Sequence, residues 1–142
     1  MAQGFGTFIL IVWLSAMLIG CGGIAPSGQP TPTPGGIVIT VRVADAEEYR
    51  IRLVDLDDIA IAQKLLAGEA VPSIPNGRVV RGEPDVNVGY SWHIDPDSVE
   101  FADTATEVCD GRPFDVEKRV ITSDRYCPWS AKIVAITPAG SH

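Results

Sequence analysis

The sequence is short of basic residues. It has 11 Lys and Arg against 18 Asp and Glu in 142 residues, which gives a formal net charge of −7. Sequence-independent binding to nucleic acid needs Lys and Arg to neutralise phosphates, and docking on anionic lipid draws on the same charges. The composition therefore argues against both kinds of binding, and we predict no nucleic-acid partner.

Catalytic motifs are equally scarce. The only histidines are His93 and His142, and neither a G-x-S-x-G elbow nor a glycine-rich phosphate loop followed by Lys is present. A Ser-His-Asp arrangement would have to combine His93 with a serine such as Ser130. We therefore predict no catalytic residues, and a small hydrolase centred on His93 is the least favoured hypothesis.

The longest apolar run is too short to span a membrane. Residues 8–19, FILIVWLSAMLI, carry no charge, whereas a spanning helix needs about 20 apolar residues. A run of this length is typical of the apolar region of a signal peptide. The preceding MAQGFGTF departs from the usual pattern because it lacks Lys and Arg.

The run ends in Leu-Ile-Gly-Cys at residues 18–21, which resembles the lipobox of bacterial lipoproteins. The resemblance implies diacylglyceryl transfer to the sulfur of Cys21 and cleavage before it, so that residues 1–20 are a signal peptide. Two or more acyl chains anchor a protein stably. We predict an exported protein, lipid-anchored to the bacterial cell membrane or envelope, with the membrane as a partner through the lipid on Cys21.

The rest of the chain divides into a linker and one domain. Residues 22–36, GGIAPSGQPTPTPGG, have almost nothing to bury, so residues 21–36 are predicted to be the lipid anchor and a Pro/Gly/Thr-rich linker. Residues 37–142 are patterned and long enough for a single globular domain.

The cysteine count favours one disulfide. With Cys21 assigned to lipid, Cys109 and Cys127 remain, and an even remainder in an oxidising exterior indicates a disulfide. A bond closing that loop stabilises a domain by about 3 kcal/mol in the chain-entropy treatment. A metal-thiolate site is the weaker alternative, because the two residues do not sit in C-x-x-C pairs.

The hydrophobic pattern predicts an α+β domain. Strand patterns occupy residues 37–43, 49–54, 78–82, 90–94, 99–103, 106–109 and 131–137. A longer helix is expected from a cap at Asp55 or Asp57 to about Ala67, with Gly68 ending it, and a short one at residues 113–120. The prediction is a small, mainly antiparallel sheet with one longer and one short helix, stapled by one disulfide.

One cluster has metal-ligand chemistry. Asp95, Asp97 and Glu100 place carboxylate oxygens in a turn, as hard divalent cations prefer, and His93 adds a ring nitrogen. An EF-hand pattern fails because its glycine position is Glu100. Alternatively, Asp95 and Asp97 hydrogen-bond the turn backbone. A divalent cation is the only candidate cofactor.

Aromatic residues flank the disulfide region. Trp92, Trp129 and Tyr126 are candidate interface residues, since aromatic side chains often anchor interfaces. In a small domain they more often pack in the core against a disulfide. Both interpretations stay open at the level of the sequence.

The segments SWHIDPDSVEFAD, TEVCDGRPFDVE and CPWSAKIV resemble the pattern of the BP-74 N-terminal domain family, over roughly residues 47–137. The resemblance implies one structural unit with Cys109 and Cys127 paired, and it implies no established activity. We therefore expect a membrane-tethered, non-enzymatic binding or structural domain with an unknown protein partner. A cation-binding domain using residues 95–100 is the alternative.

Overall fold

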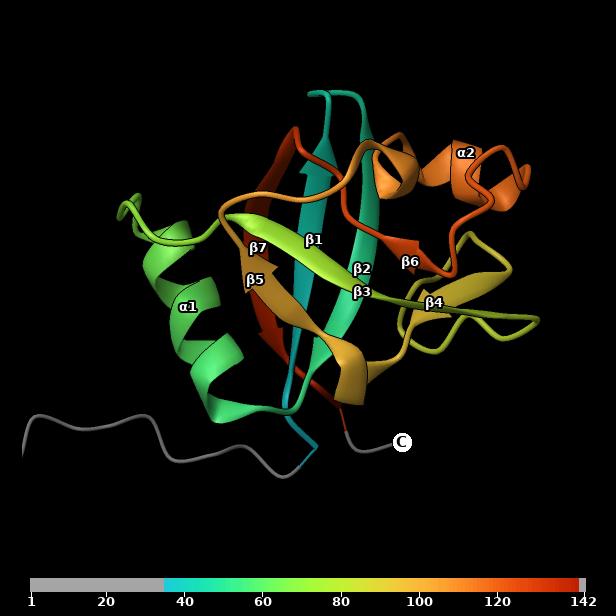
Figure 1. The fold of residues 1–142 in the computed structure, drawn as a ribbon. Coiled ribbons are helices and arrows are strands. Elements are labelled where there is room, and N and C mark those ends of the chain that lie inside the picture. The colour runs from blue at the N-terminus through green and yellow to red at the C-terminus, as the bar shows by residue number, and fades with distance from the viewer. Residues whose placement is uncertain (1–34, 141–142) are drawn as a thin grey trace, which may run out of the picture. The chain divides into compact units, whose positions relative to one another are not determined.

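The computed structural model describes residues 35–140 (Figure 1). The predicted signal peptide, Cys21, most of the predicted linker and His142 lie outside the described residues. Within residues 35–140 the chain forms seven strands, two α-helices and two 3-10 helices. No helix in that range is long and apolar enough to cross a membrane.

One sheet has three antiparallel strands in the order β2-β1-β7. β1 (Ile37–Val43) lies in the middle, between β2 (Glu47–Leu53) and β7 (Ala131–Pro138). The β-branched residues of β1 suit a pleated strand, and alternate ones such as Ile39 and Val41 are fully buried. The centre of the sheet therefore supplies much of the core.

A tight turn joins β1 to β2. The backbone N–H of Ala46 donates to the carbonyl of Val43 (3.1 Å), and both Ala44 and Asp45 have positive φ, 50° and 54°. Such turns match the twist of a hairpin but are unfavourable for residues other than Gly, Asn and Asp. Ala44 is therefore held in a conformation that it rarely adopts alone.

The longer helix, α1 (Leu56–Leu66), begins where the sequence predicted. The Asp55 side chain caps it by accepting from the backbone N–H groups of Asp57 (2.8 Å) and Asp58 (3.3 Å). The cap is thus Asp55 rather than Asp57. Ala62 is the buried residue of α1, and it packs into the core beside β7.

The remaining strands gather around β3 (Ile74–Arg81), which pairs antiparallel with three short strands. These are β4 (Trp92–Ile94), β5 (Glu100–Ala102) and β6 (Arg125–Tyr126). Figure 1 shows β3 and β5 crossing in front of the β2-β1-β7 sheet, and the core lies between these two groups of strands. The predicted α+β fold with a mainly antiparallel sheet is confirmed.

Several local predictions were wrong. β3 begins at Ile74, four residues before the strand pattern at residues 78–82. Pro75 is tolerated because β3 pairs there with β5 alone. Residues 107–109 form a 3-10 helix, η2 (Glu107–Cys109), instead of a strand. β6 was not predicted, because two residues carry no periodicity.

The two remaining helices are short. The turn predicted at residues 95–98 is a 3-10 helix, η1 (Pro96–Ser98), capped by Asp95. The predicted short helix is α2 (Pro113–Glu117), which ends earlier than residue 120. Its proline stands at the start of the helix, where no N–H partner is needed.

Candidate interaction surface

Three of the four predicted cation ligands, His93, Asp95 and Glu100, are engaged in separate interactions. Asp95 forms an ion pair with Arg78 and accepts from the backbone N–H of Asp97 (3.1 Å). The hydrogen bond from Arg78, followed by that from Asp97, lowers the pKa of the Asp95 carboxyl. Asp95 therefore has the turn-stabilising role that was the alternative to metal binding.

His93 and Glu100 have other partners. His93 alternates with the buried Trp92 and Ile94 on β4, and its Nδ1 lies 2.6 Å from the carbonyl oxygen of Glu83. Glu100 pairs with Arg125 (2.9 Å). Among residues 35–140, no group of three or more His, Cys, Asp or Glu side chains is placed to hold a metal ion.

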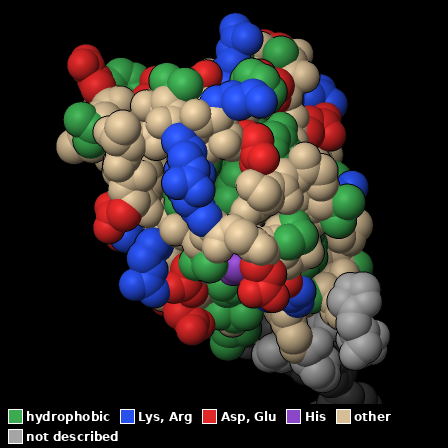
Figure 2. Space-filling view, turned by 90° about the vertical axis from the view of Figure 1, so that its right-hand side faces the viewer, with side chains coloured by type: hydrophobic (Ala, Val, Ile, Leu, Met, Phe, Trp, Pro, Cys, Tyr) green, Lys and Arg blue, Asp and Glu red, His purple; other side chains and the backbone are tan. Residues whose placement is uncertain are grey.

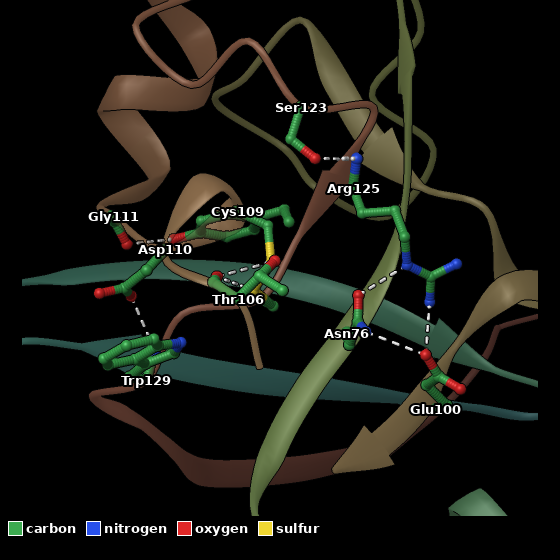
Figure 3. The surroundings of a disulfide bond; sticks show 11 residues. Asn76, Glu100, Thr106, Cys109, Asp110, Gly111, Ser123, Arg125 and Trp129 are labelled. Carbon is green, nitrogen blue, oxygen red and sulfur yellow. Dashed lines mark hydrogen bonds and ion pairs between the residues drawn. A yellow bond between two sulfur atoms is a disulfide. The ribbon is translucent and has the colours of Figure 1, made fainter. Parts of the chain in front are cut away.

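Arg125 ties three strands together on one side of the disulfide (Figure 3). Its Nε donates to Oδ1 of Asn76 (2.8 Å), and its Nη2 donates to Oε1 of Glu100 (2.9 Å). Asn76 closes the network by donating to the same oxygen of Glu100 (2.9 Å). β6, β3 and β5 are therefore linked by side chains as well as by backbone pairing.

Two of the three candidate interface aromatics belong to the core. Trp92 and Tyr126 are buried, and each packs against Tyr49 with ring centroids 5.8 and 5.2 Å apart. Burial raises the pKa of both tyrosines well above the ordinary value. Packing in the core was the alternative interpretation of these residues, and only Trp129 remains at the surface.

The disulfide joins η2 to Cys127, the residue that follows β6. Cys109 and Cys127 are bonded, their Cα atoms lie 5.1 Å apart, and both are buried. The backbone N–H of Cys127 also donates to the carbonyl of Cys109 (2.9 Å). This covalent and hydrogen-bonded junction fixes the loops on either side of it.

Asp110, next to the disulfide, holds the loop that carries Trp129. Its Oδ1 accepts from the backbone N–H of Trp129 (2.8 Å). Tyr126 donates its hydroxyl to the carbonyl of Gly111 (3.0 Å), which fixes the segment that leads into α2. Figure 3 shows Asp110 and Trp129 on the opposite side of the disulfide from the Arg125 network.

The tip of the β1–β2 hairpin is tied to the same region. The Oγ of Ser130 accepts from the backbone N–H of Ala44 (3.1 Å), and Oε2 of Glu47 accepts from that of Phe114 (2.9 Å). Segments far apart in sequence therefore meet at one end of the domain. Their backbones are positioned by hydrogen bonds rather than left free.

Three large apolar side chains are exposed in these segments. Val108 of η2 is 70% exposed, Phe114 of α2 52% and Trp129 46%. We call these three residues the disulfide-end surface. The Lys118 ammonium lies 5.0 Å from the centre of the Phe114 ring, and Figure 2, which views the side of α2 and β4, shows apolar side chains among both acidic and basic ones. Exposed aromatic side chains of this kind often anchor protein interfaces.

The sequence did not single out Val108 or Phe114. Phe114 and Val116 lie two positions apart on α2, which puts them on nearly opposite faces of the helix. Since Val116 is fully buried, Phe114 has to face outward. The spacing was visible in the sequence, but which of the two is buried depends on the tertiary packing.

A polar cavity lies at the start of α1. A cavity of about 280 Å³ is lined by Val54, Asp55, Asp58, Pro96, Asp97 and Val99. Desolvation, with the nearby Asp55 and Asp57 charges, raises the pKa of Asp58 to about 6. The site concentrates negative charge through Asp55, Asp58 and Asp97.

Comparison with known proteins gives a family but no closer relative. The BP-74 N-terminal domain matches residues 37–140, the range that forms the fold described above. Neither the curated proteins nor the solved structures contain a match. The predicted resemblance is confirmed: the chain belongs to the BP-74 N-terminal domain family.

Proposed function

We propose that this chain is an exported lipoprotein, anchored through Cys21, that presents its BP-74 N-terminal domain as a non-enzymatic binding module at the membrane. The lipobox-like end of the first apolar run supports the anchor. The disulfide supports export, since such bonds persist in oxidising compartments. The linker of residues 21–36 would hold the domain away from the lipid surface.

The observation that carries the binding function is the disulfide-end surface. Exposed Val108, Phe114 and Trp129 sit on backbone that is fixed by the disulfide and by hydrogen bonds that the backbone donates to Asp110 and Glu47. A preorganised surface loses little conformational entropy on binding, and aromatic side chains carry a large share of interface energy. The partner that fits is a protein with a complementary apolar surface.

The hydrolase hypothesis has little geometric support. His93 contacts the carbonyl oxygen of Glu83, and the Ser130 hydroxyl accepts the backbone N–H of Ala44. Each side chain is therefore held by a different local contact. A nucleophile and its base need to lie within hydrogen-bond reach of one another.

The anchor is tested by changing Cys21. Cys21→Ser should abolish incorporation of labelled fatty acid and move the protein out of the membrane fraction or leave it uncleaved. Gly23→Ser, two residues away, is the matched control and should be acylated like the wild type. A Cys21→Ser protein that is still acylated and processed would refute the lipoprotein proposal.

The binding surface is tested by site-specific photo-crosslinking in whole cells. A photoreactive residue at position 108, 114 or 129 should give the same crosslinked partner from all three positions. Val88 is the matched control, because it is 74% exposed but lies in the loop between β3 and β4. Equal labelling from position 88, or a different product from each site, would contradict a single binding surface.

A further inference from the structure

Arg119 has a backbone conformation that arginine rarely adopts. It follows Lys118, the C-cap of α2, and its φ is 59°. The backbone N–H of Arg119 donates to the carbonyl of Val116 (3.1 Å). The N–H of Val120 donates to the carbonyl of Asp115 (2.9 Å), which completes a Schellman motif. The left-handed residue of that motif is usually Gly, because a Cβ is unfavourable there, and strained residues of this kind cluster at functional sites.

The side chain of Arg119 lines a cavity beside β3. The cavity has a volume of about 370 Å³. One wall is the end of β3, at Val79 and Arg81, and the other is the segment after α2, at residues 119 and 121–124. This volume is at the lower end of the range for small-molecule sites.

A second arginine lines the same cavity from β3. Arg81 donates from its Nη1 to the carbonyl of Val116 (2.8 Å), which fixes its guanidinium beside the end of α2. A guanidinium has five N–H donors, so this contact leaves most of them for a ligand. The cavity is therefore lined by two guanidinium groups that come from different segments of the chain.

The charge of these arginines is not neutralised by an ion pair. Within residues 35–140 neither Arg81 nor Arg119 forms one, although Asp124 lines the same cavity. Glu117, which lies near Arg81, accepts instead from the backbone N–H of Ser91 (2.9 Å) and from its hydroxyl (3.0 Å). In a chain with 18 acidic and 11 basic residues, the cavity thus has a local excess of positive charge.

Hydroxyl groups add further donors on fixed backbone. The Oγ of Ser123 accepts from the backbone N–H of Arg125 (3.1 Å; Figure 3), which leaves its own O–H free to donate, and Thr122 lines the cavity beside it. The backbone N–H of Val79 donates to the carbonyl of Asp124 (2.8 Å) and holds this segment against β3. Donors on fixed backbone lose little conformational entropy when a ligand binds.

We propose that this cavity binds the phosphate group of a small phosphate monoester, with Arg81 and Arg119 as its main ligands. Arginine pairs with phosphate through two parallel N–H···O bonds. A monoester has three terminal oxygens that can accept from two guanidinium groups and the hydroxyls, whereas a carboxylate has only two oxygens. The donor set therefore favours phosphate over carboxylate.

The proposal explains why Arg stands where Gly would suit the helix end better. Arg119→Gly should relieve the strained backbone and raise the melting temperature, while it removes one of the two guanidinium groups. Binding would then be retained at a cost in stability, as is common at functional sites. The cavity does not include Val108, Phe114 or Trp129, so its success or failure is independent of the proposed function.

The test is equilibrium dialysis of the full chain in nonionic detergent against radiolabelled inorganic phosphate, at an ionic strength held constant with chloride. Binding should be saturable, and Arg81→Gln and Arg119→Gln should each weaken it at least about tenfold, as expected for the loss of hydrogen bonds from a charged group. Arg50→Gln is the matched control. It removes the same charge from an exposed arginine of β2 that lines a different cavity, so it should bind phosphate like the wild type.

Two further arms separate the proposal from its alternatives. Unlabelled glycerol phosphate should displace the label at concentrations at least about tenfold lower than acetate does. Arg119→Gly should lose binding and melt at a higher temperature than the wild type. The absence of saturable binding, equal weakening by Arg50→Gln, or equal displacement by acetate would overturn the proposal. A lower melting temperature for Arg119→Gly would also overturn it, because Arg119 would then serve the fold.

Discussion

Gly77 is a position where one added methyl group should collide with a side chain of the core. A Cβ on Gly77 would lie 2.2 Å from Cγ2 of Ile94, which is buried in the core. Carbon atoms in contact prefer about 3.5–4.0 Å, so Ile94 or the β3–β4 pair must move by more than about 1 Å. Overpacking of this kind costs about 1–3 kcal/mol, so Gly77→Ala should lower the melting temperature by roughly 4–8 °C for each kcal/mol.

The measurement is urea denaturation of a soluble form that begins at residue 22. Tryptophan fluorescence monitors the unfolding. Gly140→Ala is the matched control, since nothing lies within 4 Å of the added Cβ and its backbone is not in the left-handed region. Its stability should stay within about 0.5 kcal/mol of the wild type.

A double variant separates the steric clash from other effects. Ile94→Ala removes Cγ2 and leaves Cβ, which lies 3.7 Å from the added methyl group, an ordinary contact. Ile94→Ala alone should cost about 2–5 kcal/mol, and adding Gly77→Ala to it should cost almost nothing more. If the two costs simply add, or if Gly77→Ala is neutral, the proposed clash is wrong.

Three further predictions concern the disulfide, a carboxyl group and cations. Replacing both Cys109 and Cys127 by Ala should lower the free energy of unfolding, measured with urea, by about 3 kcal/mol. Reducing the disulfide of the wild type should cause the same loss, and a wild type that keeps its stability in reductant would contradict the prediction. Burial raises the folded-state pKa of Asp58 to about 6 from an unfolded value of 3.8, so its charged form opposes folding above that pKa, and the penalty disappears as the pH falls below the unfolded value. Asp58→Asn should therefore raise the melting temperature near about pH 8 and leave it unchanged below about pH 3.5; an equal shift at both would contradict the pKa. Calcium, magnesium, zinc and EDTA should leave the melting temperature unchanged, because Asp95 is occupied by Arg78; a shift that Asp97→Asn abolishes would restore the cation hypothesis.

Much of the fold was visible in local sequence patterns. β-branched residues predicted the strand at β1, and the aspartates after β2 predicted the start of α1. The even number of cysteines beyond Cys21 predicted the bond between Cys109 and Cys127, which the structure contains. These features depend on the residues themselves or on their near neighbours, so one sequence is enough to find them.

The candidate surfaces were only partly predictable. Trp92 and Trp129 have the same chemistry, yet one is fully buried and the other is nearly half exposed. The difference arises because Trp92 alternates inward on β4 and packs against Tyr49, whereas Trp129 lies in a loop held by Asp110. A side chain's burial is decided by the distant segments that pack on it, and the sequence contains those segments without placing them.

By itself the sequence determined the class of the domain, the covalent link between its cysteines and the strongly patterned elements. Tertiary structure alone decided that Gly77 faces Ile94, that a bulge shifts the phase of β7, and that β7 ends the sheet. Each of these is a relation between residues far apart in the chain. Local propensity acts over a few residues, whereas the pairing of strands and the fit of the core are fixed only when the whole chain is folded.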